Sequence, residues 1–410
     1  MCYLENNSIL NPFQYGFRKR KSTTLAVNHF INNCFAALEN RFFVLGIFLD
    51  FSKAFDTIDH GILTQKLEHY GIRDKELKWF KNYLDQRTQR VKLDDVLSDE
   101  QDLTCGVPQG SVLGPTLFII YTNELPFLFT DTQIEPILYA DDTNLFYKFR
   151  NFTKTDNQLI NMFLEKLRLW TIRNKLSLNA RKTNVLIFSS PHAQTKPHDI
   201  LFNFQIGNEN INKIASEVKF LGVKLNSSLN WSSHVTLVQN KLRSKIQAFL
   251  KISKLLEKTT LIKIYYAFIH PHITYCLDSY GNAPKYLTDK ILILQKKFIR
   301  VIHGANHKVH TKPLFSNTKI LTITQLFKFR LLCLAHKLYY DITRKEFKNP
   351  KYNTRFSLYS LPIKRTSNKY GDKITIQNAS MLWNEIPTDI RAEVDFANFK
   401  AALRDHLVGF

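Results

Sequence analysis

Two adjacent aspartates interrupt an apolar stretch, and this feature most restricts the fold. The stretch is ILYADDTNLFY, residues 137–147. Apolar runs on both sides of a short polar break predict a strand, a turn and a returning strand. Two carboxylates at the tip of such a hairpin repel each other unless a cation lies between them, and Mg²⁺ is a hard ion that takes oxygen ligands. A metal site and a solvated Asp-Asp turn both explain these residues. Other parts of the sequence are needed to decide between these two explanations.

Another acidic residue ends a strongly apolar run. Residues 42–49 (FFVLGIFL) carry no charge and predict a strand buried on both faces, and Asp50 follows directly. A carboxylate at the end of a buried strand is costly unless it is paired or binds a metal. If this strand and the hairpin share one sheet, Asp50, Asp141 and Asp142 converge. Three such carboxylates are expected for phosphoryl transfer with two metal ions about 3.5–4 Å apart.

The net charge indicates the kind of partner. Lys and Arg number 57 against 35 Asp and Glu, which gives a formal charge of +22. Such a surplus favours a polyanionic partner, with nucleic acid ahead of an acidic membrane surface. The uncharged apolar runs are too short to span a bilayer, so no membrane partner is expected. Five scattered cysteines form no C-x-x-C pair, which argues against disulfides and structural zinc and suits an intracellular compartment, nuclear or cytoplasmic.

Basic residues gather in two places. Residues 18–21 (RKRK) follow a glycine, and Arg18 and Lys19 are candidates for phosphate binding. A solvated basic loop is the alternative, and the block also resembles a nuclear localisation patch. Residues 227–276 contain a single acid, Glu257, and predict helices with a basic face. The nucleic-acid-binding candidates there are Lys241, Arg243, Lys245, Lys251, Lys254 and Lys258, with ordinary solvated side chains as the alternative.

Three further segments complete the pattern. Residues 106–115 (GVPQGSVLGP) hold three glycines and two prolines, so their backbone can approach a ligand closely. Residues 218–225 (VKFLGVKL) predict a strand with an internal glycine, where another backbone or a ligand can come close. Residues 89–97 and 102–106 predict a strand pair.

Three motifs in a fixed order carry a family resemblance. FLDFSKAFD at 48–56, GVPQGS at 106–111 and YADD at 139–142 resemble the A, B and C motifs of reverse transcriptases. Residues 14–24, 56–60 and 178–188 resemble the non-LTR (LINE-type, jockey-like) retrotransposon class in particular. The resemblance extends over nearly the whole chain.

The resemblance implies an α+β fold with the right-hand architecture of polymerases. Its palm is an antiparallel sheet with packed helices, joined to partial fingers and followed by a helical thumb and an α-rich C-terminal region. The implied domains are a reverse transcriptase domain, a basic helical thumb and a C-terminal region of unknown role, at residues 1–226, 227–310 and 311–410.

The resemblance also implies roles for individual residues. Asp50, Asp141 and Asp142 match metal-binding carboxylates, and the backbone of Phe51 matches a carbonyl ligand, for two Mg²⁺ ions with Mn²⁺ as an alternative. Phe55 falls where the family places an aromatic ring under the sugar, which excludes a 2′-hydroxyl. The remaining matches are Gln109 and Gly110 in the nucleotide pocket, Arg18 and Lys19 as nearby charge, Lys182 as the donor of a proton to pyrophosphate, and Phe220, Leu221 and Gly222 in the primer-grip strand.

The implied function is RNA-directed DNA polymerisation onto a primer 3′-hydroxyl. Its partners would be an RNA template, a DNA primer, dNTPs and an endonuclease acting in trans. The family carries fingers sequence, including an Arg-Pro-Ile-Ser segment, upstream of the point where this chain begins. We therefore expect an N-terminally truncated polymerase, the 3′-proximal part of a longer element protein. A catalytically inactive, nucleic-acid-binding remnant of the same fold is the alternative.

Overall fold

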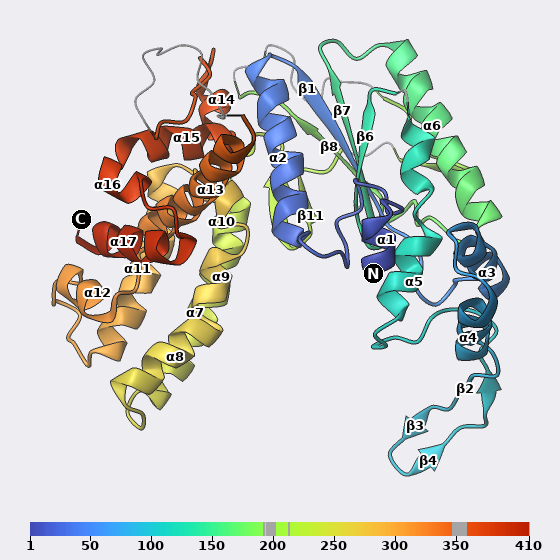
Figure 1. Ribbon diagram of the computed structural model, residues 1–410, viewed down its shortest axis with the longest axis horizontal. Coiled ribbons are helices and arrows are strands. Elements are labelled where there is room, and N and C mark those ends of the chain that lie inside the picture. Colours follow the sequence, from blue (N-terminus) through green and yellow to red (C-terminus); the bar gives the residue numbers. More distant parts are fainter. Residues whose placement is uncertain (131, 192, 194–201, 212–213, 347–358, 410) are drawn as a thin grey trace. The chain divides into compact units, whose positions relative to one another are not determined.

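The computed structural model describes residues 1–130, 132–191, 193, 202–211, 214–346 and 359–409 (Figure 1). These residues divide into two compact units. The first consists of residues 1–26 and 42–221, and the second of residues 27–41 and 222–410. Each unit combines helices with at least one strand, so the chain is a mixed helix-and-sheet protein.

The first unit holds the larger sheet and the helices that cover it. Its elements are α1 (Cys2–Asn6), β1 (Phe43–Leu49), α3 (His60–His69), α4 (Asp74–Leu84), β2 (Thr88–Gln89), β3 (Lys92–Leu93), β4 (Val96–Leu97), β5 (Gln101–Asp102), α5 (Gly114–Tyr121), η1 (Leu125–Phe129), β6 (Ile134–Tyr139), β7 (Asp142–Phe149), α6 (Lys154–Arg173), β8 (Asn184–Phe188), β9 (Gln205–Ile206), β10 (Glu209–Asn210) and β11 (Glu217–Phe220).

The four-stranded sheet has the order β6-β7-β1-β8, and each neighbouring pair is antiparallel. β6 and β7 form the predicted hairpin, and β1 is the predicted buried strand, so both predictions are confirmed. In the β1–β7 ladder Leu49 lies opposite Thr143. The residues that follow β1 and begin β7, Asp50 and Asp142, therefore lie at the same end of the sheet.

Side chains alternate between the two faces of β1, as they must in a strand. Leu45, Ile47 and Leu49 join the hydrophobic core that includes residues of α3, α5 and α6. Figure 1 shows these helices together on one side of β1, β7 and β6. On the opposite face, the rings of Phe48 and Phe220 lie 5.7 Å apart, so β11 covers that side of the strand. Burial on both faces explains why the 42–49 run is apolar throughout.

The strand pair predicted for residues 89–97 and 102–106 is wrong. β3 instead pairs with β4, while β2 pairs with β5. Residues 89–97 therefore fold back on themselves within a longer antiparallel arm. The reversal lies at Asp94, whose φ of 52° is left-handed. Aspartate tolerates this conformation better than most residues, because its short side chain can hydrogen-bond locally.

The single strand predicted for residues 218–225 is also wrong. Leu221 and Gly222 have φ values of 44° and 81°, so both are left-handed. Two consecutive left-handed residues make a tight two-residue turn, which separates β11 from β12 (Val223–Asn226). The predicted primer-grip strand is therefore broken at its centre. The division between the two units falls between the same two residues.

The second unit is largely helical. Besides β12 it contains most of α2 (Thr23–Glu39), together with α7 (Ser232–Ile252), α8 (Lys258–Phe268), α9 (His270–Thr274), α10 (Leu277–Tyr280), α11 (Lys285–Ile302), α12 (Lys312–Thr318), α13 (Ile323–Glu346), α14 (Lys369–Lys373), α15 (Thr375–Glu385), α16 (Thr388–Arg391) and α17 (Phe396–Gly409). Within the described segments, no helix combines the length and the apolar character needed to cross a membrane.

Helix α2 precedes β1 in the chain but packs with the C-terminal helices. The Asn32 side-chain carbonyl accepts hydrogen bonds from the backbone N–H of Thr375, at 2.9 Å, and from its hydroxyl, at 3.0 Å. The Glu39 carboxylate accepts from the backbone N–H groups of Ser367, Asn368 and Gly371. These acceptors satisfy donors at the starts of α14 and α15, where backbone N–H groups have no partner within their own helix.

Candidate active site

The Asp-Asp pair lies at the tip of the β6–β7 hairpin. Tyr139 and Asp142 form the last cross-strand pair, which leaves Ala140 and Asp141 as the turn. Ala140 has a φ of 54°, an uncommon conformation for a residue with a Cβ. Asp141 is partly exposed and Asp142 is exposed, so both carboxylates can meet a ligand from solvent.

The three predicted carboxylates influence one another. Partial burial, together with the charges of Asp141 and Asp50, raises the pKa of Asp142 to about 6. Burial also raises the pKa of Asp141, to which the Asp50 charge adds. Carboxylates disfavour ionisation next to one another, so a cation placed among them would be attracted. The structure therefore brings together the three acids that the sequence singled out.

Lys182 lies beside the acid at the end of β1. Its ammonium nitrogen is 3.8 Å from Oδ2 of Asp50. Residues 177–179 run along the end of β1, with the N–H of Ser52 donating to Ser177 and that of Asn179 donating to Asp50. The Asn179 side chain then accepts from the N–H of Lys182 at 3.2 Å. This turn explains how Lys182, three residues after Asn179, reaches back to Asp50.

The donor set suits a hard divalent cation, since it consists of carboxylate oxygens. Such an ion would reduce the mutual repulsion of Asp50, Asp141 and Asp142. Their side chains are not gathered into a finished ligand set: within the described part of the chain, no three His, Cys, Asp or Glu side chains are grouped as metal ligands. The Lys182 ammonium, 3.8 Å from Oδ2 of Asp50, would compete with such an ion for that oxygen.

Phe55 is held in an aromatic cluster. Its ring stacks on Phe118 of α5 with centroids 4.3 Å apart, and Phe17 approaches it edge-on at 6.3 Å. Its backbone carbonyl accepts the N–H of Val107 at 3.0 Å, which ties the segment after β1 to the glycine-rich loop. Phe55 is partly exposed, so one side of a fixed ring remains accessible.

The glycine-rich loop docks on the same segment. The Gln109 amide donates to Asp56 Oδ1 at 2.8 Å. Gly106 has a φ of 84°, and a Cβ there would lie 2.9 Å from the Asp56 carbonyl oxygen, so only glycine fits. Gly110 also has a left-handed φ, 78°, but is exposed, and no atom lies within 4 Å of a Cβ built on it. The space above Gly110 is therefore open.

The two basic candidates near the N-terminus differ in their surroundings. Arg18 donates to both Glu5 oxygens, at 2.9 and 2.6 Å, and to the Asn11 carbonyl at 2.7 Å. Its side chain is 10% exposed, so the guanidinium is committed to the protein's own acceptors. Lys19 is exposed. The phosphate-binding prediction for this block therefore depends on Lys19 more than on Arg18.

The three primer-grip candidates do not form one surface. Phe220 is buried against Phe48, whereas Leu221 and Gly222 form the turn after β11. A Cβ on Gly222 would lie 3.3 Å from the ring of Tyr275. The sequence pattern identified the turn as a place of close approach but not as a reversal of the chain.

The six basic candidates occupy α7, the start of α8 and the turn between them. Among the described residues, none of the six is paired with a carboxylate. Burial lowers the pKa of His272, and the charges of Lys245 and Lys241 lower it further, as expected beside an unneutralised positive surface. The candidates other than Lys245 are exposed, and they are Lys241, Arg243, Lys251, Lys254 and Lys258.

Sequence reasoning assigned no role to two residues that contact the site. Gln14 accepts the N–H of Ala140 at 3.0 Å, and Asp56 accepts the Gln109 amide. Gln14 lies just before the basic block and Asp56 just after Phe55, so both were inside motifs already noted. Nothing in the sequence alone shows that Gln14 meets the backbone of Ala140 or that Asp56 meets the side chain of Gln109.

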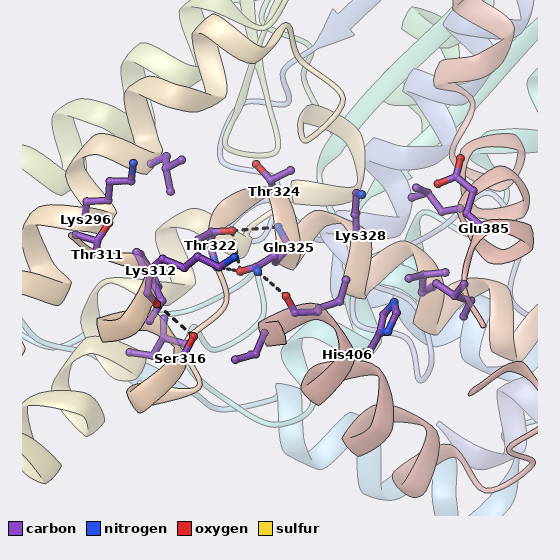
Figure 2. A pocket seen from close by; sticks show the side chains of 18 of the residues that line it. Lys296, Thr311, Lys312, Ser316, Thr322, Thr324, Gln325, Lys328, Glu385 and His406 are labelled. Carbon is purple, nitrogen blue, oxygen red and sulfur yellow. Dashed lines mark hydrogen bonds between the residues drawn. The ribbon is translucent and has the colours of Figure 1, made fainter. Parts of the chain in front are cut away.

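A cavity of about 590 Å³ lies within the second unit. Figure 2 shows Lys296, Lys312 and Lys328 around it, with Thr322 and Gln325 hydrogen-bonded to each other. Its charged side chains are exposed or partly exposed. The sequence predicted no site here, and we assign none.

Comparisons with known proteins place this geometry in a family. The sequence profile of "Reverse transcriptase (RNA-dependent DNA polymerase)" matches residues 2–225. The chain is 29% identical over 316 residues to "RNA-directed DNA polymerase from mobile element jockey" of Drosophila melanogaster, which covers 75% of this chain and 34% of that protein. It is 26% identical over 332 residues to "Probable RNA-directed DNA polymerase from transposon X-element" of the same species, covering 78% of this chain and 35% of the relative. The chain thus spans about a third of the length of these relatives.

Solved structures include a telomerase from Candida tropicalis in complex with a fragment of telomeric RNA. It is 12% identical, covers 80% of this chain and 55% of the other, and has a TM-score of 0.40. The profile match covers more than half of the chain and contains the sheet, the three carboxylates and the glycine-rich loop. The chain therefore belongs to the reverse transcriptase (RNA-dependent DNA polymerase) family.

Proposed function

We propose that this chain is the RNA-directed DNA polymerase part of a non-LTR retrotransposon protein. The observation that carries the proposal is the β1–β7 ladder, because it brings the end of β1 to the Asp-Asp turn. Asp50, Asp141 and Asp142 thereby share one end of the sheet, and the charge of Asp50 helps to raise the pKa of Asp141 and of Asp142. The similarity to the jockey and X-element polymerases supports the same assignment.

We propose a right-hand arrangement for the chain, with palm and partial fingers in residues 1–226, a thumb in residues 227–310 and an added region in residues 311–410. The division between compact units after residue 221 supports the first boundary. Residues 311–410 share a unit with residues 227–310, so we expect the thumb and the added region to act as one body.

The reaction we propose joins a nucleotide to a primer 3′-hydroxyl, with an RNA template, a DNA primer and dNTPs as substrates. Asp50, Asp141, Asp142 and the Phe51 carbonyl would hold two Mg²⁺ ions, or Mn²⁺. Bound metal would supply charge neutralisation for the triphosphate and activation of the hydroxyl. Lys182, placed 3.8 Å from Asp50, would give a proton to the leaving pyrophosphate.

The nucleotide would lie between the aromatic cluster and the glycine-rich loop. Phe55 would support the sugar, and its fixed ring would leave no room for a 2′-hydroxyl. The open space above Gly110 would let the backbone meet the incoming base, while the bond from Gln109 to Asp56 holds the loop in place. Lys19, rather than Arg18, would supply positive charge near the triphosphate.

The duplex would lie on the basic face of α7 and α8. Lys and Arg side chains without a carboxylate partner bind phosphates by releasing counterions, which requires no sequence recognition. An endonuclease acting in trans would supply the primer end. The six proposed contacts are Lys241, Arg243, Lys245, Lys251, Lys254 and Lys258.

The test is primer extension by the purified chain on poly(rA)/oligo(dT) with dTTP and Mg²⁺. We expect incorporation that is lost in Asp141→Asn, a change that keeps the size of the side chain and removes its charge. Incorporation that is absent in the unsubstituted chain, or equal in the variant, would contradict the proposal.

A second candidate is a nucleic-acid-binding remnant of the same fold without polymerase activity. The commitment of Arg18 to Glu5 and Asn11 favours it, because that charge is withdrawn from a triphosphate. Salt-sensitive binding of an RNA–DNA duplex without dTTP incorporation would select this candidate.

A further inference from the structure

We propose that Gln14 is a positioning residue that fixes the Ala140–Asp141 turn and so sets the placement of Asp141 and Asp142. The inference rests on the proposed polymerase function, which gave Gln14 no role. It rests on contacts within the first unit, where a side chain far away in sequence meets the backbone of the turn.

The Gln14 side-chain carbonyl accepts two backbone N–H groups. It accepts that of Ala140 at 3.0 Å and that of Gly16 at 2.7 Å. The residue is 3% exposed, so water does not offer an easy replacement. One oxygen therefore joins the N-terminal segment to the turn that carries Asp141.

The backbone around Gln14 continues the same contact. The N–H of Tyr15 donates to the Leu138 carbonyl at 2.8 Å, and the N–H of Leu138 donates to the Phe13 carbonyl at 3.0 Å. Residues 13–15 thus lie against β6, the strand at the end of the β6-β7-β1-β8 order. The bridge is parallel, between Gln14 and Leu138.

Gly16 shows how close this approach is. A Cβ on Gly16 would lie 2.4 Å from the Ala140 nitrogen, so no other residue fits there without moving the segment away. Arg18 holds the segment from the other side, because it donates to the Asn11 carbonyl at 2.7 Å and to the Gln14 carbonyl at 3.4 Å. The arginine expected to bind phosphate thus anchors the residue that holds the turn.

The turn needs such support because of its conformation. Ala140 is left-handed, with a φ of 54°, which is unfavourable for alanine. Its N–H is buried and has the Gln14 oxygen as acceptor, and a buried donor that loses its acceptor is costly. Without Gln14 we expect the turn to relax, which would displace the carboxylate of Asp141, the next residue.

Three variants of the full chain test this inference. Gln14→Met keeps the length of the side chain and removes the acceptor. Gln14→Glu keeps an acceptor oxygen, so it should preserve the hydrogen bonds. Gln295→Met is the matched control, because Gln295 is also fully buried and donates to Tyr265 and Leu321, but lies in the second unit.

Two measurements do not require polymerase activity. The first is hydrogen exchange of the Ala140 amide, which should become about tenfold faster in Gln14→Met and stay slow in Gln14→Glu and Gln295→Met. The second is Mn²⁺ affinity by electron paramagnetic resonance, which should fall about tenfold in Gln14→Met and remain unchanged in the control. If Gln14→Met does not fold, Gln14→Asn is the alternative. Its side chain is one methylene shorter, so its oxygen lies farther from the Ala140 N–H, and it should give the same two results.

Unchanged Ala140 exchange and unchanged Mn²⁺ affinity in the Met or Asn variant would overturn the inference. Equal loss in Gln295→Met would also overturn it, because a general loss of stability would then explain the effect. A wild-type chain that makes no DNA would contradict the proposed function alone, since amide exchange still reports whether Gln14 holds the turn.

Discussion

At the scale of single residues, the ring of Phe55 is the feature whose role can be tested most directly. It stacks on Phe118 and meets the edge of Phe17, and these contacts oppose a movement of the ring that would admit a larger sugar. We expect Phe55→Ala to admit ribonucleotides and to reduce discrimination between dTTP and UTP by roughly 10–100-fold, the usual range for a steric pocket contact.

The measurement is the ratio of kcat/KM for the two nucleotides on one primer–template. Phe127→Ala is a suitable control, because Phe127 is 62% exposed and lies in η1, outside the cluster. An unchanged ratio in Phe55→Ala would show that another group selects the sugar.

The same residues show how far sequence reasoning reaches. Asp50, Asp141 and Asp142 could be identified because each is a charged residue within or next to an apolar run. Such a charge is costly unless it is paired or binds a ligand. The contacts of Gln14 and Asp56 were not predictable, because both are ordinary polar residues whose partners lie 126 and 53 positions away. Local pattern identifies the residue that needs a partner, but the partner is chosen by tertiary packing.

At the scale of elements, helix α7 carries a histidine that should make stability depend on pH. Burial, together with the charge of Lys241, lowers the pKa of His234 to about 4. Its Nδ1 accepts the N–H of Lys224 at 3.4 Å, while Nε2 is buried without a partner in the described structure. The folded chain therefore keeps this imidazole neutral, whereas the unfolded chain protonates it near pH 6.5.

Since only the unfolded state gains this proton between about pH 6.5 and 4, stability should fall as the pH is lowered through that window. At pH 5 the loss from His234 is about 2 kcal/mol, from about 1.4 kcal/mol per pH unit. Urea unfolding at pH 7 and pH 5 measures it, with His234→Asn as the comparison. A variant that loses as much stability as the wild type over this interval would contradict the assignment.

Elements were predicted best where the apolar period was long. The β6–β7 hairpin and β1 follow from spacing alone. The turn at Leu221 and Gly222 was missed because leucine is an unusual residue at a left-handed position, so the usual hairpin signal of Asn-Gly or Asp-Gly is absent. The arm from β2 to β5 was mispaired because its strands are only two residues long.

At the scale of the whole molecule, the charge of +22 predicts salt-dependent binding. The logarithm of the association constant for an RNA–DNA duplex should fall linearly with the logarithm of the salt concentration. Replacing Lys241 and Lys245 by alanine should reduce the slope of that plot by about 2, since each phosphate contact contributes about 1.

Fluorescence anisotropy over a salt series provides the slopes. The matched control replaces Lys75 and Lys78, which are exposed on α4 of the first unit, and it should leave the slope nearer to that of the wild type. Equal effects of the two double variants would mean that general charge, rather than the α7 surface, governs binding.

The position of α2 also sets the order in which the protein can be completed during synthesis. Glu39 and the Gly371 N–H that it accepts are separated by 332 residues. At roughly 5–20 residues per second, a ribosome needs on the order of 20–60 s to synthesise this length of chain. For most of this interval α2 has left the ribosome without the segments that bind Asn32 and Glu39. A chaperone that shields exposed helices during translation is therefore expected to bind nascent chains that contain α2 but end before residue 360.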